Sequence, residues 1–258
     1  MMVKPIPVRR GQISMIRNLL KRASWVRHVA TLAVLAAVAG CAAPPARLVG
    51  APPVLQLPKL GQSWQFRELD GFSDRELARV GFRVTRSDAD GVELAVTVDG
   101  QPLSGLREGQ VERYARPWDV LEDASYGRVR RYTPAMPLLR ADAPLETRVD
   151  DRMRVERPPK PRAENWIALS RFRGWETVTV PAGTFRVARY ERVMSYYDDD
   201  PFRWRTERRE TLWYAPEVQH WVRRELAGTW TRPPYQRGRR GEVLRDDWIV
   251  WELTAYTP

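Results

Sequence analysis

Hydrophobic and polar residues alternate along most of the last third of this 258-residue chain. The alternation is clearest in residues 174–193, 205–226 and 242–256. A period of two places apolar side chains on one face of a β-strand. Turn-forming residues interrupt the pattern at Pro181-Ala182-Gly183 and at Ala215-Pro216-Glu217. We therefore predict five antiparallel strands joined by tight turns, a β-meander.

Shorter alternating runs precede this region. Residues 61–69 predict one strand, a second begins near Phe82, and residues 92–98 predict a third. Residues 87–91, between the second and third strands, are typical of a hairpin turn. The turn contains Asp-Ala-Asp-Gly but lacks the further carboxylate ligands of an EF-hand loop. We therefore interpret it as a plain turn.

Eight prolines interrupt the segment between residues 101 and 165, where no long element is expected. We place a boundary near residue 135, which gives an N-terminal β subdomain at 61–135 and a C-terminal β-meander domain at 136–258. Residues 57–70 and 136–150 both open on a proline and end in a strand followed by aspartate. Two related halves are therefore one interpretation of a fold that is mainly β.

An apolar run at residues 29–40 follows seven basic residues and no acidic residue. This order predicts a signal peptide at residues 1–40 with a short helical segment, and Met15 is an alternative start. The run is well short of the roughly 20 residues that a transmembrane helix needs, so we expect cleavage. Residues 41–60 contain five prolines and predict a stiff tether between the membrane and the β domain.

The chain has one cysteine, Cys41, which ends the sequence Val38-Ala39-Gly40-Cys41 and cannot close an intrachain disulfide. These four residues resemble the lipobox of bacterial lipoproteins, and the resemblance covers residues 15–45. It implies cleavage between Gly40 and Cys41, a diacylglyceryl cysteine at Cys41 and acylation of the new amino terminus, which palmitate would label. In these lipoproteins aspartate after the cysteine marks inner-membrane retention. Ala42 therefore implies the outer membrane, with the domain on the periplasmic side.

Charge argues against a nucleic-acid partner once the signal is removed. The whole chain has formal charge +11, but seven of its 43 basic residues and none of its 32 acidic residues precede Cys41. The mature chain therefore carries 36 positive and 32 negative residues, a formal charge of +4. Arginine clusters remain at 128–131, 203–209 and 237–240. They predict either a patch for an anionic envelope surface or, as we favour, a solvated face paired with nearby carboxylates.

A second resemblance rests on Val-Pro-Ala-Gly-Thr-Phe at residues 180–185 and Leu-Trp-Tyr-Ala-Pro-Glu-Val at residues 212–218. These motifs look like the tail of β-rich periplasmic proteobacterial domains of largely unknown function, over residues 165–258. The resemblance implies a curved sheet or half-barrel, distantly similar to carriers that hold acyl chains on a concave face. It assigns no activity to this chain.

Catalytic groups are few in the mature chain, so we assign no catalytic residue and expect no cofactor. His220 is its only histidine and has no second metal donor at useful spacing, so we predict a partly buried packing residue and no metal site. The adjacent pairs Asp150-Asp151 and Asp246-Asp247 should point to opposite sides of a strand and could not share a sugar. Other carboxylates leave a glycan-active enzyme open.

Aromatic residues gather on the predicted C-terminal strands and give the remaining candidate site. The residues that could share one apolar face are Trp213, Tyr214, Trp221, Trp248 and Trp251. Such a face could line a hollow for an acyl chain or stack on sugars. In the alternative that we favour, these side chains fill the core of the sheet.

These patterns predict a membrane-anchored, periplasm-facing lipoprotein that acts without catalysis as a binding or envelope-assembly component. Its partners would be the membrane, through Cys41, and an envelope protein or lipid. One alternative is a lipid or lipoprotein carrier with an apolar concave face. The other is a carboxylate-dependent glycan-active enzyme, which needs two carboxylates facing each other across a cleft of roughly 5 to 10 Å.

Overall fold

The computed structural model describes residues 49–258, apart from residues 103–110, 117, 124–128, 159–161, 199, 201 and 235–240. The predicted signal peptide, Cys41 and the first part of the tether lie outside the described residues. In the described part of the chain the regular structure is all β-strand, and no helix there is long and apolar enough to cross a membrane. The strands are β1 (Ser63–Asp70), β2 (Glu76–Asp88), β3 (Gly91–Val98), β4 (Gln101–Pro102), β5 (Val111–Arg116), β6 (Asp119–Asp123), β7 (Arg130–Pro137), β8 (Arg148–Glu156), β9 (Glu164–Val180), β10 (Gly183–Tyr197), β11 (Arg205–Ala215), β12 (His220–Arg232) and β13 (Glu242–Thr257). The prediction of a mainly β fold is confirmed.

The strands form one antiparallel sheet that closes on itself. The hydrogen-bonded order runs β2-β1-β13-β12-β11-β10-β9-β8-β7-β6-β5-β3, and β2 also pairs with β3. This second pairing joins the two ends of the order into a closed barrel of twelve strands, to which the short β4 is added beside β3. The expectation of an open curved sheet or half-barrel is therefore corrected. Closure removes the open edges that such a sheet would expose.

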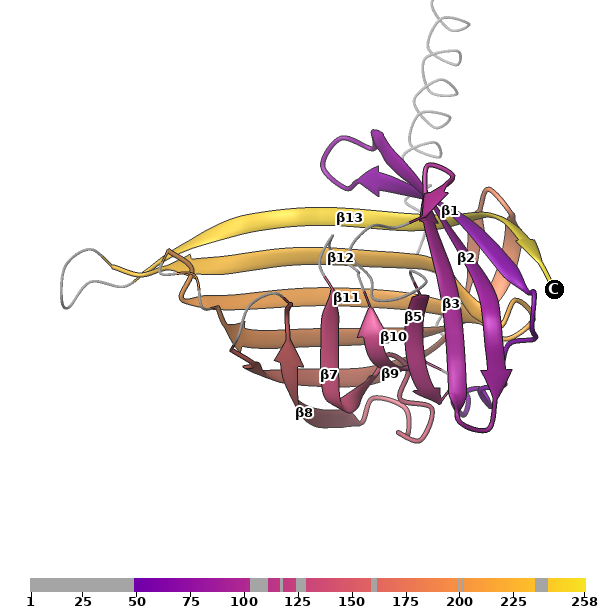
Figure 1. Ribbon diagram of the computed structural model, residues 1–258, viewed down its shortest axis with the longest axis horizontal. Coiled ribbons are helices and arrows are strands. Elements are labelled where there is room, and N and C mark those ends of the chain that lie inside the picture. Colours follow the sequence, from indigo (N-terminus) through magenta and orange to yellow (C-terminus); the bar gives the residue numbers. More distant parts are fainter. Residues whose placement is uncertain are drawn as a thin grey trace, which may run out of the picture. The chain divides into compact units, whose positions relative to one another are not determined.

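The five strands of the predicted C-terminal meander are confirmed as β9 to β13. Figure 1 shows them as long strands that run side by side, crossed at a steep angle by β3, β5 and β7. The β9–β10 turn consists of Pro181 and Ala182, and Gly183 after it has φ +141°, a conformation that favours glycine. Trp64 in β1 lies opposite Tyr256 in β13, so the first and last strands of the described chain meet in the barrel wall.

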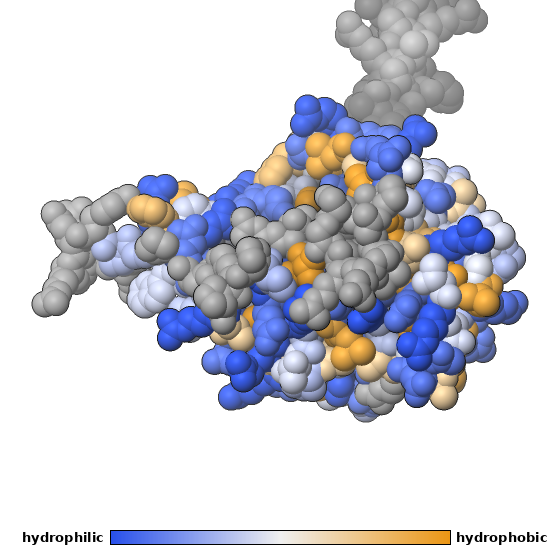
Figure 2. Space-filling view, in the orientation of Figure 1, coloured by the Kyte–Doolittle hydropathy of each residue, from blue (hydrophilic) through white to orange (hydrophobic). Residues whose placement is uncertain are grey.

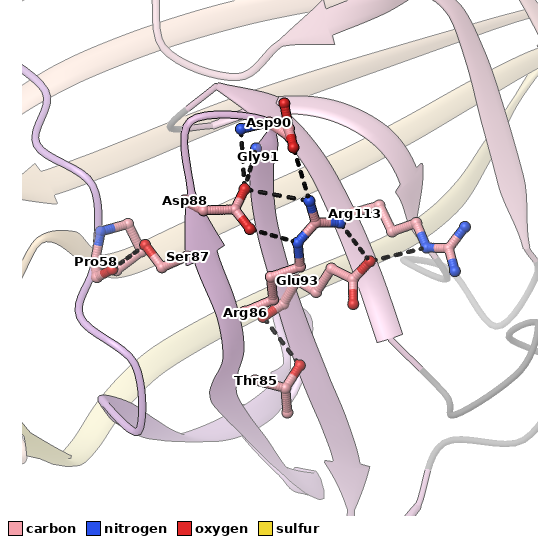
Figure 3. Close-up of polar contacts among 9 residues, drawn as sticks. All are labelled: Pro58, Thr85, Arg86, Ser87, Asp88, Asp90, Gly91, Glu93 and Arg113. Atoms are coloured by element: carbon pink, nitrogen blue, oxygen red, sulfur yellow. Dashed lines mark hydrogen bonds and ion pairs between the residues drawn. The ribbon is translucent and has the colours of Figure 1, made fainter.

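The turn between β2 and β3 is the predicted hairpin turn. Asp88 Oδ1 accepts hydrogen bonds from the backbone N–H groups of Asp90 and Gly91, at 2.9 and 3.2 Å. Arg86 forms ion pairs with the Asp88 and Asp90 carboxylates, at 2.7 and 3.4 Å (Figure 3). Backbone amides and a guanidinium therefore bind the two carboxylates of the Asp-Ala-Asp-Gly sequence, and together they fix the turn.

Residues 47–258 form one compact unit. The boundary that we placed near residue 135 lies inside β7. Part of the predicted tether, residues 49–60, packs on the barrel: Pro53 and Pro58 are buried, and Trp175 Nε1 donates a 2.9 Å hydrogen bond to the Ala51 carbonyl oxygen. The compact unit therefore begins before β1.

Candidate functional site

Aromatic rings fill the barrel interior around the start of β12. His220 is completely buried, and its ring centroid lies 3.7 Å from that of Trp221, 4.4 Å from that of Trp64 and 4.7 Å from that of Trp118. Phe66 and Phe82 join the cluster, with centroids 5.3 and 5.6 Å from that of His220. Rings packed at these distances leave no room for an acyl chain among them.

His220 is a packing residue, as predicted, but it is fully rather than partly buried. Its Nδ1 lies 3.1 Å from the Trp221 carbonyl oxygen. Burial lowers the pKa of His220 well below the usual value, and the nearby Arg224 guanidinium lowers it further. Among the described residues there is no cluster of three or more metal-binding side chains. His220 is therefore neutral at physiological pH and contributes packing rather than proton transfer.

A buried ion triad lies farther along the interior. Arg192 of β10 and Glu210 of β11 are directly opposite each other, and Arg224 of β12 also donates to the Glu210 carboxylate. Their side chains are 1%, 0% and 6% exposed, in that order. Burial alone would raise the pKa of Glu210, but the two guanidiniums outweigh burial and hold that pKa below the usual value. Glu210 is therefore ionised and locked, a poor general acid.

Other buried carboxylates are contacted by tyrosine hydroxyls. The Tyr132 hydroxyl lies 3.3 Å from both carboxylate oxygens of Asp123, and the Tyr114 hydroxyl donates to Glu112 at 2.7 Å. Burial raises the pKa of Asp123 although Arg130 and Arg224 oppose the change. Asp123 is only 3% exposed, so a glycan in solvent cannot reach it in this conformation. The interior thus resembles a packed polar core more than a two-carboxylate cleft.

The two adjacent carboxylate pairs behave differently from each other. The side chains of Asp150 and Asp151 are 57% and 19% exposed and bind different arginines, as opposite faces require. Asp246 and Asp247, in contrast, both bind Arg208, at 3.0 and 2.9 Å. The register of β12 against β13 shifts between Ala227 and Thr229, and this irregularity breaks the simple alternation near the pair. The expectation that Asp246 and Asp247 point apart was therefore wrong.

Four of the five aromatic residues that could have formed one apolar face belong to the core or pack against it, and Trp248 does not. Trp213, Tyr214 and Trp221 belong to the buried hydrophobic core, and Trp251 packs against it. Trp213 lies between the guanidiniums of Arg189 and Arg223, 5.7 and 5.3 Å from its ring centroid.

Trp248, the fifth residue of this set, donates to Glu225 at 2.9 Å and meets the exposed Phe72 edge-on. The structure therefore does not bring the five residues together around one hollow.

A hollow of about 700 Å³ lies over strands β7 to β11. Three arginines line it, Arg152 and Arg154 of β8 and Arg205 of β11, and all three are exposed. The other lining residues are Thr133, Met153, Asn165, Trp166, Ile167, Ser195, Tyr196 and Tyr197. No carboxylate is among the described residues that line this hollow. It therefore offers positive charge, neutral donors and an exposed aromatic ring.

Sequence reasoning missed the interior triad and two of the three arginines of the hollow. Arg205 fell within the cluster noted at 203–209, but Arg152 and Arg154 stand in a strand with only three apolar residues, Val149, Met153 and Val155. Charged residues occupy both faces of β11, so alternation alone could not place Glu210 inside. The available signal was the spacing of Arg152 and Arg154, two residues apart and hence on one face of a strand.

No protein-family model and no curated protein matches the chain. Three solved structures give low similarity. A lipoprotein candidate from Parabacteroides distasonis is 12% identical, with 77% of this chain and 96% of that chain covered and a TM-score of 0.43. An exported-protein candidate with a YmcC-like fold from Bacteroides fragilis is 13% identical, with 83% and 100% covered and a TM-score of 0.44. The hypothetical lipoprotein YmcC from Escherichia coli is 8% identical, with 77% and 89% covered and a TM-score of 0.41. These similarities assign neither a family nor a function to the chain.

Proposed function

We propose that this chain is a lipid-anchored lipoprotein of the bacterial outer membrane, and that its barrel faces the periplasm and acts as a non-enzymatic binding or envelope-assembly component. The packing of the described barrel interior carries the proposal. Aromatic rings surround His220, and two arginines hold Glu210. A filled interior leaves the outer surface of the barrel as the place where a partner binds.

The lipid anchor in this proposal rests on the sequence Val38-Ala39-Gly40-Cys41. This sequence ends an apolar run that follows several basic residues. Acyl chains at Cys41 would contribute about 0.8 kcal/mol per buried methylene, so several chains hold a folded domain firmly on a bilayer. The outer surface then stays close to the membrane throughout the life of the protein.

The anchor is tested in the producing bacterium with the full chain. Cys41→Ser should abolish incorporation of labelled palmitate and release the protein from the membrane fraction. Ala42→Ser is the matched control, because it changes the neighbouring residue and retains the thiol, and it should remain labelled. Unchanged labelling of Cys41→Ser would exclude a lipid at this cysteine.

A further inference from the structure

Many of the described arginines on the outside of the barrel are paired with carboxylates. Arg67 pairs with Glu252 at 2.7 Å, Arg131 with Glu122 at 3.3 Å, and Arg209 with Glu207 at 3.1 Å. Pairs of this kind reduce the charge that the surface presents to an anion.

The hollow over β7 to β11 departs from this arrangement. Within the described part of the chain, Arg152, Arg154 and Arg205 have neither an ion pair nor a side-chain hydrogen bond. Glu207, which lies near the hollow on β11, is engaged by Arg209. Three exposed guanidiniums therefore retain their full hydrogen-bonding capacity in one region, and a guanidinium fork matches phosphate oxygens geometrically.

Exposed aromatic side chains adjoin these arginines. Tyr197, which lines the hollow, is 63% exposed, and its ring centroid lies 6.5 Å from that of Trp204, which is 53% exposed. Phe202, two residues before Trp204, is 68% exposed. Hydrophilic residues dominate the barrel face shown in Figure 2, with hydrophobic residues scattered over it. Three exposed aromatic rings, at the end of β10 and in its connection to β11, are thus a concentrated apolar feature beside arginines without ion pairs.

We propose that Arg152, Arg154, Arg205, Tyr197, Phe202 and Trp204, here called the arginine–aromatic surface, dock on the anionic phospholipid surface of a bilayer. Arginines attract anionic headgroups, and aromatic rings favour the interface between water and hydrocarbon. The inference rests on the proposed function in one respect: a lipid anchor at Cys41 keeps the barrel close to a bilayer. The docked surface would then fix the orientation of the barrel relative to the membrane.

The arginines of this surface lie on two strands, β8 and β11, with two other strands between them. Arg154 on β8 and Arg205 on β11 are separated by three strand spacings, about 14 Å at 4.8 Å per spacing. Asn165 and Tyr197 lie between them on β9 and β10. Neighbouring lipid headgroups can each meet one exposed arginine at this separation, so the spacing fits a phospholipid surface.

The test uses the unacylated chain from residue 42 onward. Residues 47–258 are one compact unit and contain every strand pair of the closed sheet, so this chain is a complete folding unit. Cosedimentation measures its binding to vesicles of equal parts phosphatidylglycerol and phosphatidylcholine, and to vesicles of phosphatidylcholine alone. The expected result is binding to the anionic vesicles that weakens as salt rises.

Arg154→Gln/Arg205→Gln should lower the partition coefficient for anionic vesicles about 25-fold, since each arginine near an anionic surface contributes about fivefold. The matched control is Arg75→Gln/Arg83→Gln, which removes the same charge from two other exposed arginines outside the hollow and should lower it less than about threefold. Trp204→Ser should weaken vesicle binding most at high salt, because salt screens the arginines and leaves aromatic insertion as the main contribution to binding. Circular dichroism should show that each variant retains the β fold.

Equal effects of the two double variants would overturn the proposal, since net charge alone would then govern binding. Absence of vesicle binding, together with calorimetric binding of soluble glycerol phosphate, would overturn it in favour of a small anion site. Capture by an envelope protein without vesicle binding would also overturn it. Because the assay uses an unacylated chain, its outcome is independent of Cys41→Ser labelling, and either proposal can fail without the other.

Discussion

His220 gives a pH dependence that tests the packing of the barrel interior. The imidazole is fully buried among aromatic rings, and burial lowers its pKa well below 6.5. The unfolded chain binds a proton near pH 6.5, whereas the folded chain does not. Between these two pKa values the unfolded state holds more protons than the folded state. The contribution of His220 to the unfolding free energy is therefore fully present above pH 6.5 and is lost as the pH falls toward the folded pKa. One proton corresponds to about 1.4 kcal/mol per pH unit, so a folded pKa below this window gives a loss of about 2 kcal/mol between pH 6.5 and 5.

Urea unfolding of the chain from residue 42, measured at intervals from pH 7.5 to pH 5, reports this loss. His220→Gln removes the titrating group, so its stability should change by about 2 kcal/mol less than that of the unsubstituted chain over the same window. Burial raises the pKa of Glu68 and Asp123, so these carboxyls favour folding as pH falls and act in the opposite direction. A parallel pH dependence of the two proteins would refute a buried neutral His220.

Two further predictions concern other parts of the barrel. Glu210→Gln removes the carboxylate that Arg192 and Arg224 share and should cost about 3 to 5 kcal/mol of unfolding free energy, whereas the surface control Glu207→Gln should cost about 1 kcal/mol or less. Equal costs in urea unfolding would contradict a buried triad. Gly91→Ala places a Cβ 2.3 Å from the Tyr114 carbonyl oxygen and should cost more than about 1 kcal/mol of unfolding free energy. Gly100→Ala should cost less, because its Cβ meets nothing within 4 Å. A urea unfolding midpoint for Gly91→Ala as high as that for Gly100→Ala would show that β5 can move.

The sequence predicted the C-terminal meander well because its strands are long, alternate regularly and are joined by turn residues. The β9–β10 turn at Pro181-Ala182 shows this most clearly. Closure could not be predicted in the same way, because β1 pairs with β13 across almost the whole described chain, from Ser63 to Thr257. Local alternation contains no information about such a distant pairing.

The proline-containing middle of the chain was read as lacking long elements, yet β7 and β8 form there. Thr133 pairs with Arg154 across these two strands, beside the cis peptide bond between Thr133 and Pro134. β8 reads Arg-Val-Asp-Asp-Arg-Met-Arg-Val-Glu, in which few apolar residues mark a face. The arginine–aromatic surface was hidden for this reason: two of its cations sit on a strand with a weak apolar pattern.

Retention of lipid by the barrel tests the central claim most directly. The chain from residue 42, exported through a cleavable non-lipoprotein signal, would be purified without detergent and washed at high salt to screen contacts with its outer surface. Native mass spectrometry then shows whether a ligand remains inside. A filled interior predicts the mass of the protein alone, whereas a reproducible added mass of fatty acid or phospholipid would contradict the account and favour a carrier.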